Sequence, residues 1–162
     1  MRKLLFFFVV VWLGACSSID CPVQNIVSVQ YTICDHNGKE YQLENYLTIY
    51  SERSDGTDTT LLNLVTGISD FSLPISYSHP EDILVFVFSE DMALTATVAD
   101  TIWIKKDDIP HFESVDCNAS FFHKITDVRH TRHCIDSLVL LNPSVTYDQQ
   151  TVHFRLVPKS ND

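Results

Sequence analysis

The segment from His111 to Cys134 is richest in side chains that bind metals or act in catalysis. It holds four of the seven histidines and two of the five cysteines of the chain. Zinc sites use histidine nitrogen and cysteine sulfur, commonly from paired short spacings. His130 and His133 have two residues between them and form one such pair, and His123 is a further candidate ligand.

The phasing of these histidines argues against a shared metal ion. In an extended segment, residues an odd number of positions apart point to opposite faces, which separates His130 from His133. The sequence offers no second short pair to complete a ligand shell. We therefore expect no metal and no other cofactor, and His123, His130 and His133 are the residues to test if a metal does bind.

The first residues have the layout of a secretory signal. Two basic residues precede an apolar run from Leu4 to Leu13, which is about half of the roughly 20 residues that a membrane-spanning helix needs. The tetrapeptide Leu13-Gly14-Ala15-Cys16 resembles the lipobox of bacterial lipoproteins. This resemblance implies a signal peptide over residues 1–15, cleavage before Cys16, and attachment of diacylglycerol and palmitate-type acyl chains to Cys16.

Several acyl chains on one residue hold a protein on a membrane durably. Ser17 and Ser18 place no acidic residue directly after Cys16, which favours the outer membrane over the inner membrane. We therefore expect a lipid-anchored protein of the cell envelope, on the periplasmic or the surface face of the outer membrane. Residues 16–24 are expected to form the lipidated N-terminus and a tether, and residues 25–162 a single folded domain.

Four cysteines remain after lipidation: Cys21, Cys34, Cys117 and Cys134. In an oxidising compartment an even number of cysteines is typical of disulfides, and four cysteines allow three pairings. The residues alone do not choose among these pairings. An even number also leaves no spare thiol for a cysteine nucleophile, and the chain has no G-x-S-x-G motif of a serine hydrolase.

The mature chain is strongly acidic. Loss of Arg2 and Lys3 with the signal leaves 9 basic and 21 acidic side chains, a formal charge of −12. Such a surface repels phosphate backbones, so we expect no nucleic acid partner. Adjacent acids such as Asp107 and Asp108 could serve carboxylate catalysis, but they are more typical of solvated turns.

Apolar and polar residues alternate along most of the chain, which predicts β-strands. In residues 25–34, for example, Val27, Val29, Tyr31 and Ile33 share one face. Further strands are predicted at residues 46–52, 59–65, 70–77, 83–90, 120–128, 135–141 and 151–157. Residues 93–106 predict two short strands or one bent strand.

Three local features refine this pattern. Asn37-Gly38 predicts a two-residue hairpin turn. Pro74 predicts an edge strand or a bulge, because proline cannot donate to a ladder, and the apolar run 83–90 predicts a strand buried on both faces. Short strands with regular turns predict an all-β fold, a single β-sandwich of immunoglobulin-like layout stapled by disulfides.

Several motifs together resemble an uncharacterised lipoprotein family of Bacteroidota, domain of unknown function 6452. They are the lipobox, Asp20-Cys21-Pro22, the LPISY of residues 73–77 and the segment from Asp100 to Asp148. The resemblance implies an exported, all-β lipoprotein domain without an established activity, and it supplies no catalytic residue. It also implies a disulfide between Cys21 and Cys117, with Cys34 and Cys134 as the second pair.

The sequence therefore indicates a non-enzymatic binding or structural module of the cell envelope. Its expected partners are the membrane, through the N-terminal lipid, and another envelope protein or a glycan. The alternative is a metal-dependent or carboxylate-based envelope enzyme, or an accessory protein, that acts on glycans.

Overall fold

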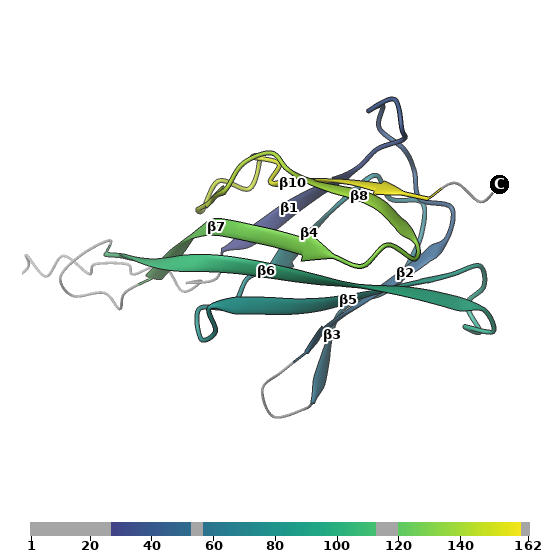
Figure 1. Cartoon of the computed structure of the whole chain (residues 1–162), viewed down its shortest axis with the longest axis horizontal. Coiled ribbons are helices and arrows are strands. Elements are labelled where there is room, and N and C mark those ends of the chain that lie inside the picture. Colours follow the sequence, from purple (N-terminus) through teal and green to yellow (C-terminus); the bar gives the residue numbers. More distant parts are fainter. Residues whose placement is uncertain (1–26, 53–56, 113–119, 160–162) are drawn as a thin grey trace, which may run out of the picture.

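The computed structural model describes residues 27–52, 57–112 and 120–159 (Figure 1). Over these ranges the chain forms ten strands and no helix, and therefore no helix long and apolar enough to span a membrane. The predicted all-β class is confirmed. The strands are β1 (Ser28–Ile33), β2 (Tyr46–Glu52), β3 (Asp58–Val65), β4 (Asp70–Pro74), β5 (Glu81–Ser89), β6 (Thr97–His111), β7 (Ser120–His130), β8 (Ile135–Leu140), β9 (Ser144–Val145) and β10 (Phe154–Pro158).

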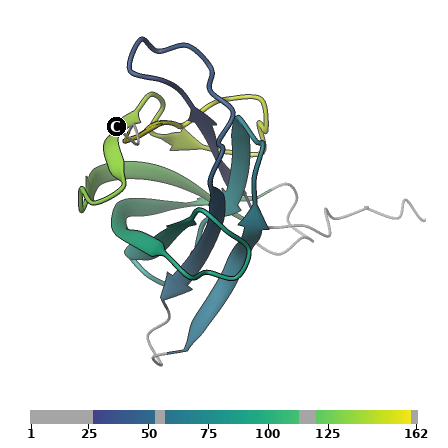
Figure 2. The same ribbon diagram turned by 90° about the vertical axis from the view of Figure 1, so that its right-hand side faces the viewer.

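These strands form two sheets that face each other (Figures 1 and 2). The smaller sheet has the order β4-β1-β10-β8, and the larger sheet has the order β3-β2-β5-β6-β7-β9. Among the described strands, β1 and β10 pair in parallel and every other pairing is antiparallel. The arrangement is sandwich-like, with two layers around one core.

The core follows from the alternation in the sequence. On β1, Val29, Tyr31 and Ile33 are at most 2% exposed. The residues between them point to the outer face of the sheet and are half-buried. The Tyr31 ring stacks on Phe71 of the same sheet at 4.8 Å and meets Phe86 of the other sheet at 6.1 Å. Aromatic pairs of this kind stabilise a core by about 0.5–1.5 kcal/mol beyond their buried area. The two sheets therefore share one core.

Most of the predicted strands are confirmed, and the burial of β5 differs from the prediction. Of the two alternatives for residues 93–106, two short strands or one bent strand, the structure has the single strand: β6 is continuous from Thr97 to His111, with a register shift between Lys105 and Lys106. The apolar run in β5 is not buried on both faces, since its alternate residues are only half-buried. A two-layer fold covers one face of each sheet, which explains the alternation. Pro74 ends β4, which is an edge strand as expected.

Asn37-Gly38 forms the predicted turn but not a hairpin between two strands. Gly38 has a φ of 78°, and the Asp35 carboxylate accepts hydrogen bonds from the N–H groups of Asn37 and Lys39, both at 2.9 Å. Only an isolated bridge joins Cys34 to Glu40 across this turn. The next strand begins at Tyr46, so residues 34–45 form a loop that extends past the sheets.

The sandwich has two ends with different contents. The tether end contains Val27, the connection from β4 to β5 and the far ends of β6 and β7; there, the Ile75 N–H donates to the Val27 carbonyl at 3.4 Å. The pocket end contains the 34–45 loop, the β5–β6 hairpin, the β7–β8 turn and the residues after β10. Figure 1 shows these groups at opposite ends of the long axis.

Candidate functional site

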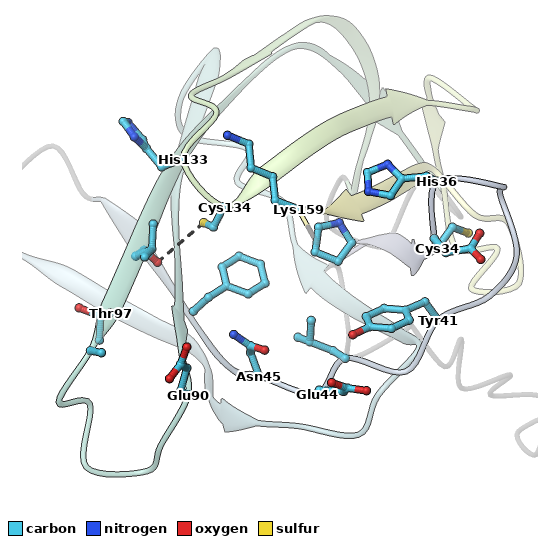
Figure 3. Close-up of a pocket in the computed structure, with 16 residues that line it drawn as sticks. Cys34, His36, Tyr41, Glu44, Asn45, Glu90, Thr97, His133, Cys134 and Lys159 are labelled. Carbon is cyan, nitrogen blue, oxygen red and sulfur yellow. Dashed lines mark hydrogen bonds between the residues drawn. The ribbon is translucent and has the colours of Figure 1, made fainter. Parts of the chain in front are cut away.

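A pocket of about 640 Å³ lies at the pocket end (Figure 3). Four parts of the chain line it: the loop after β1, the β5–β6 hairpin, the β7–β8 turn and the residues that follow β10. Its volume falls within the range of about 300–1,000 Å³ that is typical of small-molecule sites. Leu43 and Phe88, both at most 5% exposed, contribute apolar surface to its lining.

One wall of the pocket is fixed by the buried carboxylate of Asp100, which is 1% exposed. It accepts hydrogen bonds from the backbone N–H groups of His133, Cys134 and Ile135 at 2.7–2.8 Å and from the Thr131 hydroxyl at 2.5 Å. Burial alone would raise the pKa of Asp100, but these hydrogen bonds outweigh it and hold the pKa well below its usual value. The ionised carboxylate therefore holds the β7–β8 turn against β6.

The same carboxylate determines the protonation state of the Cys134 thiol, which faces the pocket. Cys134 Sγ lies 3.2 Å from Asp100 Oδ2 and 3.7 Å from the Val98 carbonyl oxygen. Burial and the hydrogen bond to Asp100 raise the pKa of Cys134 far above that of a free cysteine. The thiol is therefore protonated at neutral pH, which makes it unsuitable as a nucleophile.

We expect Cys134 to react slowly with iodoacetamide at pH 8, at least about tenfold slower than free cysteine, because only the thiolate is alkylated. Quantitative mass spectrometry of the peptide that contains Cys134 measures the rate. The same chain unfolded in urea provides the control, since unfolding removes the contact with Asp100 and exposes the Cys134 thiol. A folded rate equal to that of the unfolded peptide would contradict the contact with Asp100.

The predicted disulfide between Cys34 and Cys134 is not formed, since both residues are free thiols in the structure. Cys34 follows β1 and Cys134 precedes β8, and β10 lies between these two strands. Strands on either side of a third are about 10 Å apart, whereas disulfides need Cα atoms within about 7 Å. The predicted Cys21–Cys117 pair and the lipidation residue Cys16 lie outside the described residues.

The polar groups of the pocket are arranged on two sides. Figure 3 shows Glu44, Asn45 and Glu90 along one side, and His36, His133 and Lys159 along the opposite side. The Lys159 ammonium donates to the Arg132 carbonyl at 2.8 Å, and His36 lies 3.7 Å from the Asp136 carboxylate.

The acidic side of the pocket is open to a ligand. Among the residues that the structure describes, none forms a hydrogen bond or an ion pair with the side chains of Glu44, Asn45 or Glu90. These side chains can accept hydrogen bonds from hydroxyl or amino groups. The pocket therefore combines apolar surface with one side of solvent-accessible acceptors that have no partner among the described residues.

The three candidate metal ligands are not brought together. His123 is 2% exposed and its Nδ1 lies 2.7 Å from an Asp108 carboxylate oxygen. His130 is seven residues further along β7, or about 23 Å at 3.3 Å per residue, and its Nδ1 contacts the Thr131 carbonyl oxygen at 2.6 Å. His133 is exposed at the pocket. Within residues 27–52, 57–112 and 120–159, no three histidine, cysteine or acidic residues are grouped to hold a metal ion.

A cluster of charged side chains lies between the sheets toward the tether end. The Lys106 side chain is fully buried, and its ammonium donates to the Asp82 carboxylate at 3.3 Å and to the His79 carbonyl at 2.5 Å. The other Asp82 oxygen accepts the Ser76 N–H at 3.1 Å. Burial raises the pKa of Asp82 and outweighs the opposing effect of Lys106.

This cluster of charged side chains was not predicted from the sequence, although the alternation along β6 indicated the inward position of Lys106. Ile102 and Ile104 face the core, so the same alternation places Lys106 inward as well. His123 belongs to the same region; burial lowers its pKa and outweighs the opposing effect of Asp108, which favours the neutral ring. The group at this position is an interior ion pair and a neutral histidine, which is a structural arrangement.

The Tyr31 hydroxyl is buried in the core between the two sheets and has no hydrogen-bond partner among the described residues. We expect Tyr31→Phe to raise the free energy of unfolding by about 1 kcal/mol, because it removes an unsatisfied buried group and keeps the stacked ring. Urea denaturation of the purified variant measures the change. Tyr41→Phe, at the pocket, is the matched control and should change little. A loss of stability in Tyr31→Phe would show that the hydroxyl has a partner.

Comparison with known proteins gives one match. A family of unknown function matches residues 46–158, from the first residue of β2 to the last residue of β10. No curated protein and no solved structure matches the chain significantly. The comparisons therefore assign no activity to the pocket.

Proposed function

The chain belongs to the DUF6452 family of unknown function, and we propose that it is an exported, lipid-anchored binding module of the cell envelope. Its pocket-end cavity binds a segment of another envelope component, either protein or glycan. The signal-like N-terminus and the lipobox-like residues before Cys16 support export and anchoring. Binding without catalysis is supported by a protonated Cys134 and by three candidate histidines that lie apart.

We also propose an immunoglobulin-like layout for the sandwich. The order β3-β2-β5-β6 in one sheet and the pair β4-β1 in the other support this proposal. They follow the C′-C-F-G and E-B orders of immunoglobulin sandwiches, with β1 as the second strand of that fold. In such sandwiches the loops at one end form the recognition surface. The pocket of this chain is built from loops in the same way.

The single observation that carries the binding proposal is the cavity of about 640 Å³ with its solvent-accessible acidic side. Buried apolar surface supplies binding energy, and a few polar groups orient the ligand. Leu43 and Phe88 supply the first, and Glu44, Asn45 and Glu90 the second. The ligand therefore needs an apolar part and hydrogen-bond donors.

Site-specific photocrosslinking in intact cells tests this proposal. We expect a crosslinking residue at Thr97, an exposed position in the pocket lining, to give an adduct of defined mass. The same residue at Thr126, exposed on β7 away from the pocket, is the control and should give none. The adduct at Thr97 should fall at least about tenfold when Asn45 and Glu90 are both replaced by alanine, since about 1.4 kcal/mol of lost contacts corresponds to that factor. Identical adducts from both positions, or no adduct at Thr97, would contradict binding at the pocket.

A further inference from the structure

Four of the ten large apolar side chains that are exposed among the described residues lie at the tether end of the sandwich, opposite the pocket. Phe112 is 65% exposed, Tyr77 63%, Ile109 47% and Tyr147 37%. Together with Phe121 they form what we call the tether-end aromatic surface. Large exposed apolar patches on a folded domain mark an interaction site.

This surface is held in place by ring contacts rather than by isolated side chains. The Tyr77 ring, in the connection from β4 to β5, stacks on Phe121 at 5.5 Å. The next residue on β7, Phe122, meets the Tyr147 ring edge-on at 4.9 Å and pairs with Ile109 across the β6–β7 ladder. Phe121 and Phe122 are neighbours on β7 and therefore point to opposite faces of the sheet, so exposed apolar side chains lie on both faces at this end of β6 and β7.

The position of Val27, the first residue that the structure describes, indicates what this surface faces. Val27 lies at the same end, because its carbonyl accepts a hydrogen bond from the Ile75 N–H. Ile75 precedes Tyr77 by two residues. Cys16 precedes Val27 by eleven residues, which span at most about 40 Å when fully extended and about 20 Å as a flexible chain. A lipid on Cys16 therefore keeps the tether end within about one domain diameter of the bilayer.

The chemistry of the surface suits a lipid interface. Tyrosine side chains favour the boundary between headgroups and acyl chains, because they have an apolar body and a polar hydroxyl, and phenylalanine side chains add apolar area that the acyl chains can bury. The mature chain has a formal charge of −12, which disfavours anionic lipid and favours a zwitterionic headgroup.

We propose that the tether-end aromatic surface rests on the bilayer that holds the lipid of Cys16, so that the pocket faces away from that bilayer. This inference rests on the lipid anchor of the proposed function. β1 runs from the tether end toward the pocket over six residues, or about 20 Å. The domain then presents the pocket to soluble or membrane-distal partners, with the sandwich as a spacer.

Fluorescence quenching by brominated lipid tests the orientation. The lipidated full chain is reconstituted in phosphatidylcholine vesicles, some with bromine on the acyl chains, in a Trp103→Phe background that removes the tryptophan of the described residues. The Tyr77→Trp variant reports the tether end. The Met92→Trp variant, at a position 65% exposed in the β5–β6 hairpin, is the matched control for the pocket end. We expect strong quenching in the Tyr77→Trp variant and at least about fivefold less in the Met92→Trp variant.

Flotation of the same vesicles separates the two proposals. If the lipidated chain does not float with vesicles, or if a Cys16→Ser chain floats equally well, the lipid anchor is wrong and the orientation falls with it. If the chain floats through Cys16 but the two tryptophans are quenched equally, or the Tyr77→Trp variant is not quenched, the anchor stands and the orientation is wrong. Added Phe112→Ser should lower quenching in the Tyr77→Trp variant about twofold or more and leave flotation unchanged.

Discussion

Replacement of Asp100 by alanine should lower the free energy of unfolding by about 3–5 kcal/mol. The substitution leaves five donors without their acceptor: the Thr131 hydroxyl, the Cys134 thiol and the N–H groups of His133, Cys134 and Ile135. Each unsatisfied buried donor costs about 1–3 kcal/mol, and water can reach some of them because His133 is exposed. Urea denaturation measures the loss, and pocket crosslinking at Thr97 should fall in parallel as the β7–β8 turn loosens.

Asp100→Asn should be nearly as harmful. Both carboxylate oxygens accept hydrogen bonds, so the amide NH₂ group would meet donors instead of acceptors. The control is Asp107→Ala, at an exposed position on the same strand, which should change stability by less than about 0.5 kcal/mol. A loss below about 1 kcal/mol in Asp100→Ala would show that the turn does not depend on the carboxylate.

The same residue predicts a pH dependence. The folded-state pKa of Asp100 is lower than its unfolded value of about 3.9. The unfolded chain therefore binds the proton more readily, and the stability contributed by Asp100 is complete above about pH 4 and is lost as the pH falls below it. Stability between pH 5 and pH 2.5 should fall less steeply in Asp100→Ala than in the natural chain. Parallel curves would contradict the lowered pKa.

Replacement of Asp82 by alanine should also cost about 3–5 kcal/mol, because it leaves the fully buried Lys106 ammonium without a counter-charge. Lys106→Met should cost less, since burial already raises the pKa of Asp82 and the carboxyl can take up a proton. The double variant Asp82→Leu/Lys106→Met should recover most of the loss, as apolar replacements of buried ion pairs often do.

A double-mutant cycle in urea, made of Asp82→Leu, Lys106→Met and the double variant, measures this coupling. Lys105→Met, at the exposed neighbouring position, is the matched control for Lys106 and should be close to neutral. The expected coupling energy between Asp82 and Lys106 is at least about 1.5 kcal/mol. Additive losses in the two single variants would show that the two charges do not depend on each other.

The sequence predicted the strands well because their signal is local. β2 has the predicted bounds, and Val29, Tyr31 and Ile33 of β1 face the core as their alternation indicates. Pro74 indicated an edge strand or a bulge, because proline has no N–H to donate to a neighbouring strand. These features depend on a residue and its nearest neighbours, so a single sequence contains them.

The pocket could not be predicted in the same way. Asp100 contacts residues 31 to 35 positions later in the chain. An aspartate within a predicted strand gives no indication of which distant residues it will bind. The Cys34–Cys134 pair, which the family resemblance implied, failed for a related reason: β10 lies between the two strands that carry these cysteines, and this sheet order is not visible in the sequence. Lys106 is the intermediate case, because its inward register was visible beside Ile102 and Ile104.

The parallel pairing of β1 with β10 has a kinetic consequence. Tyr31 lies opposite Phe154, so the smaller sheet joins residues that are 123 positions apart. Contacts of such large sequence separation form slowly, because the intervening chain must close as a loop. The smaller sheet therefore cannot close before the last residues of the chain are available, and the domain cannot complete its fold while it is still being synthesised. For a chain that is threaded through a translocation channel, as we propose for this one, the smaller sheet stays incomplete until β10 has crossed.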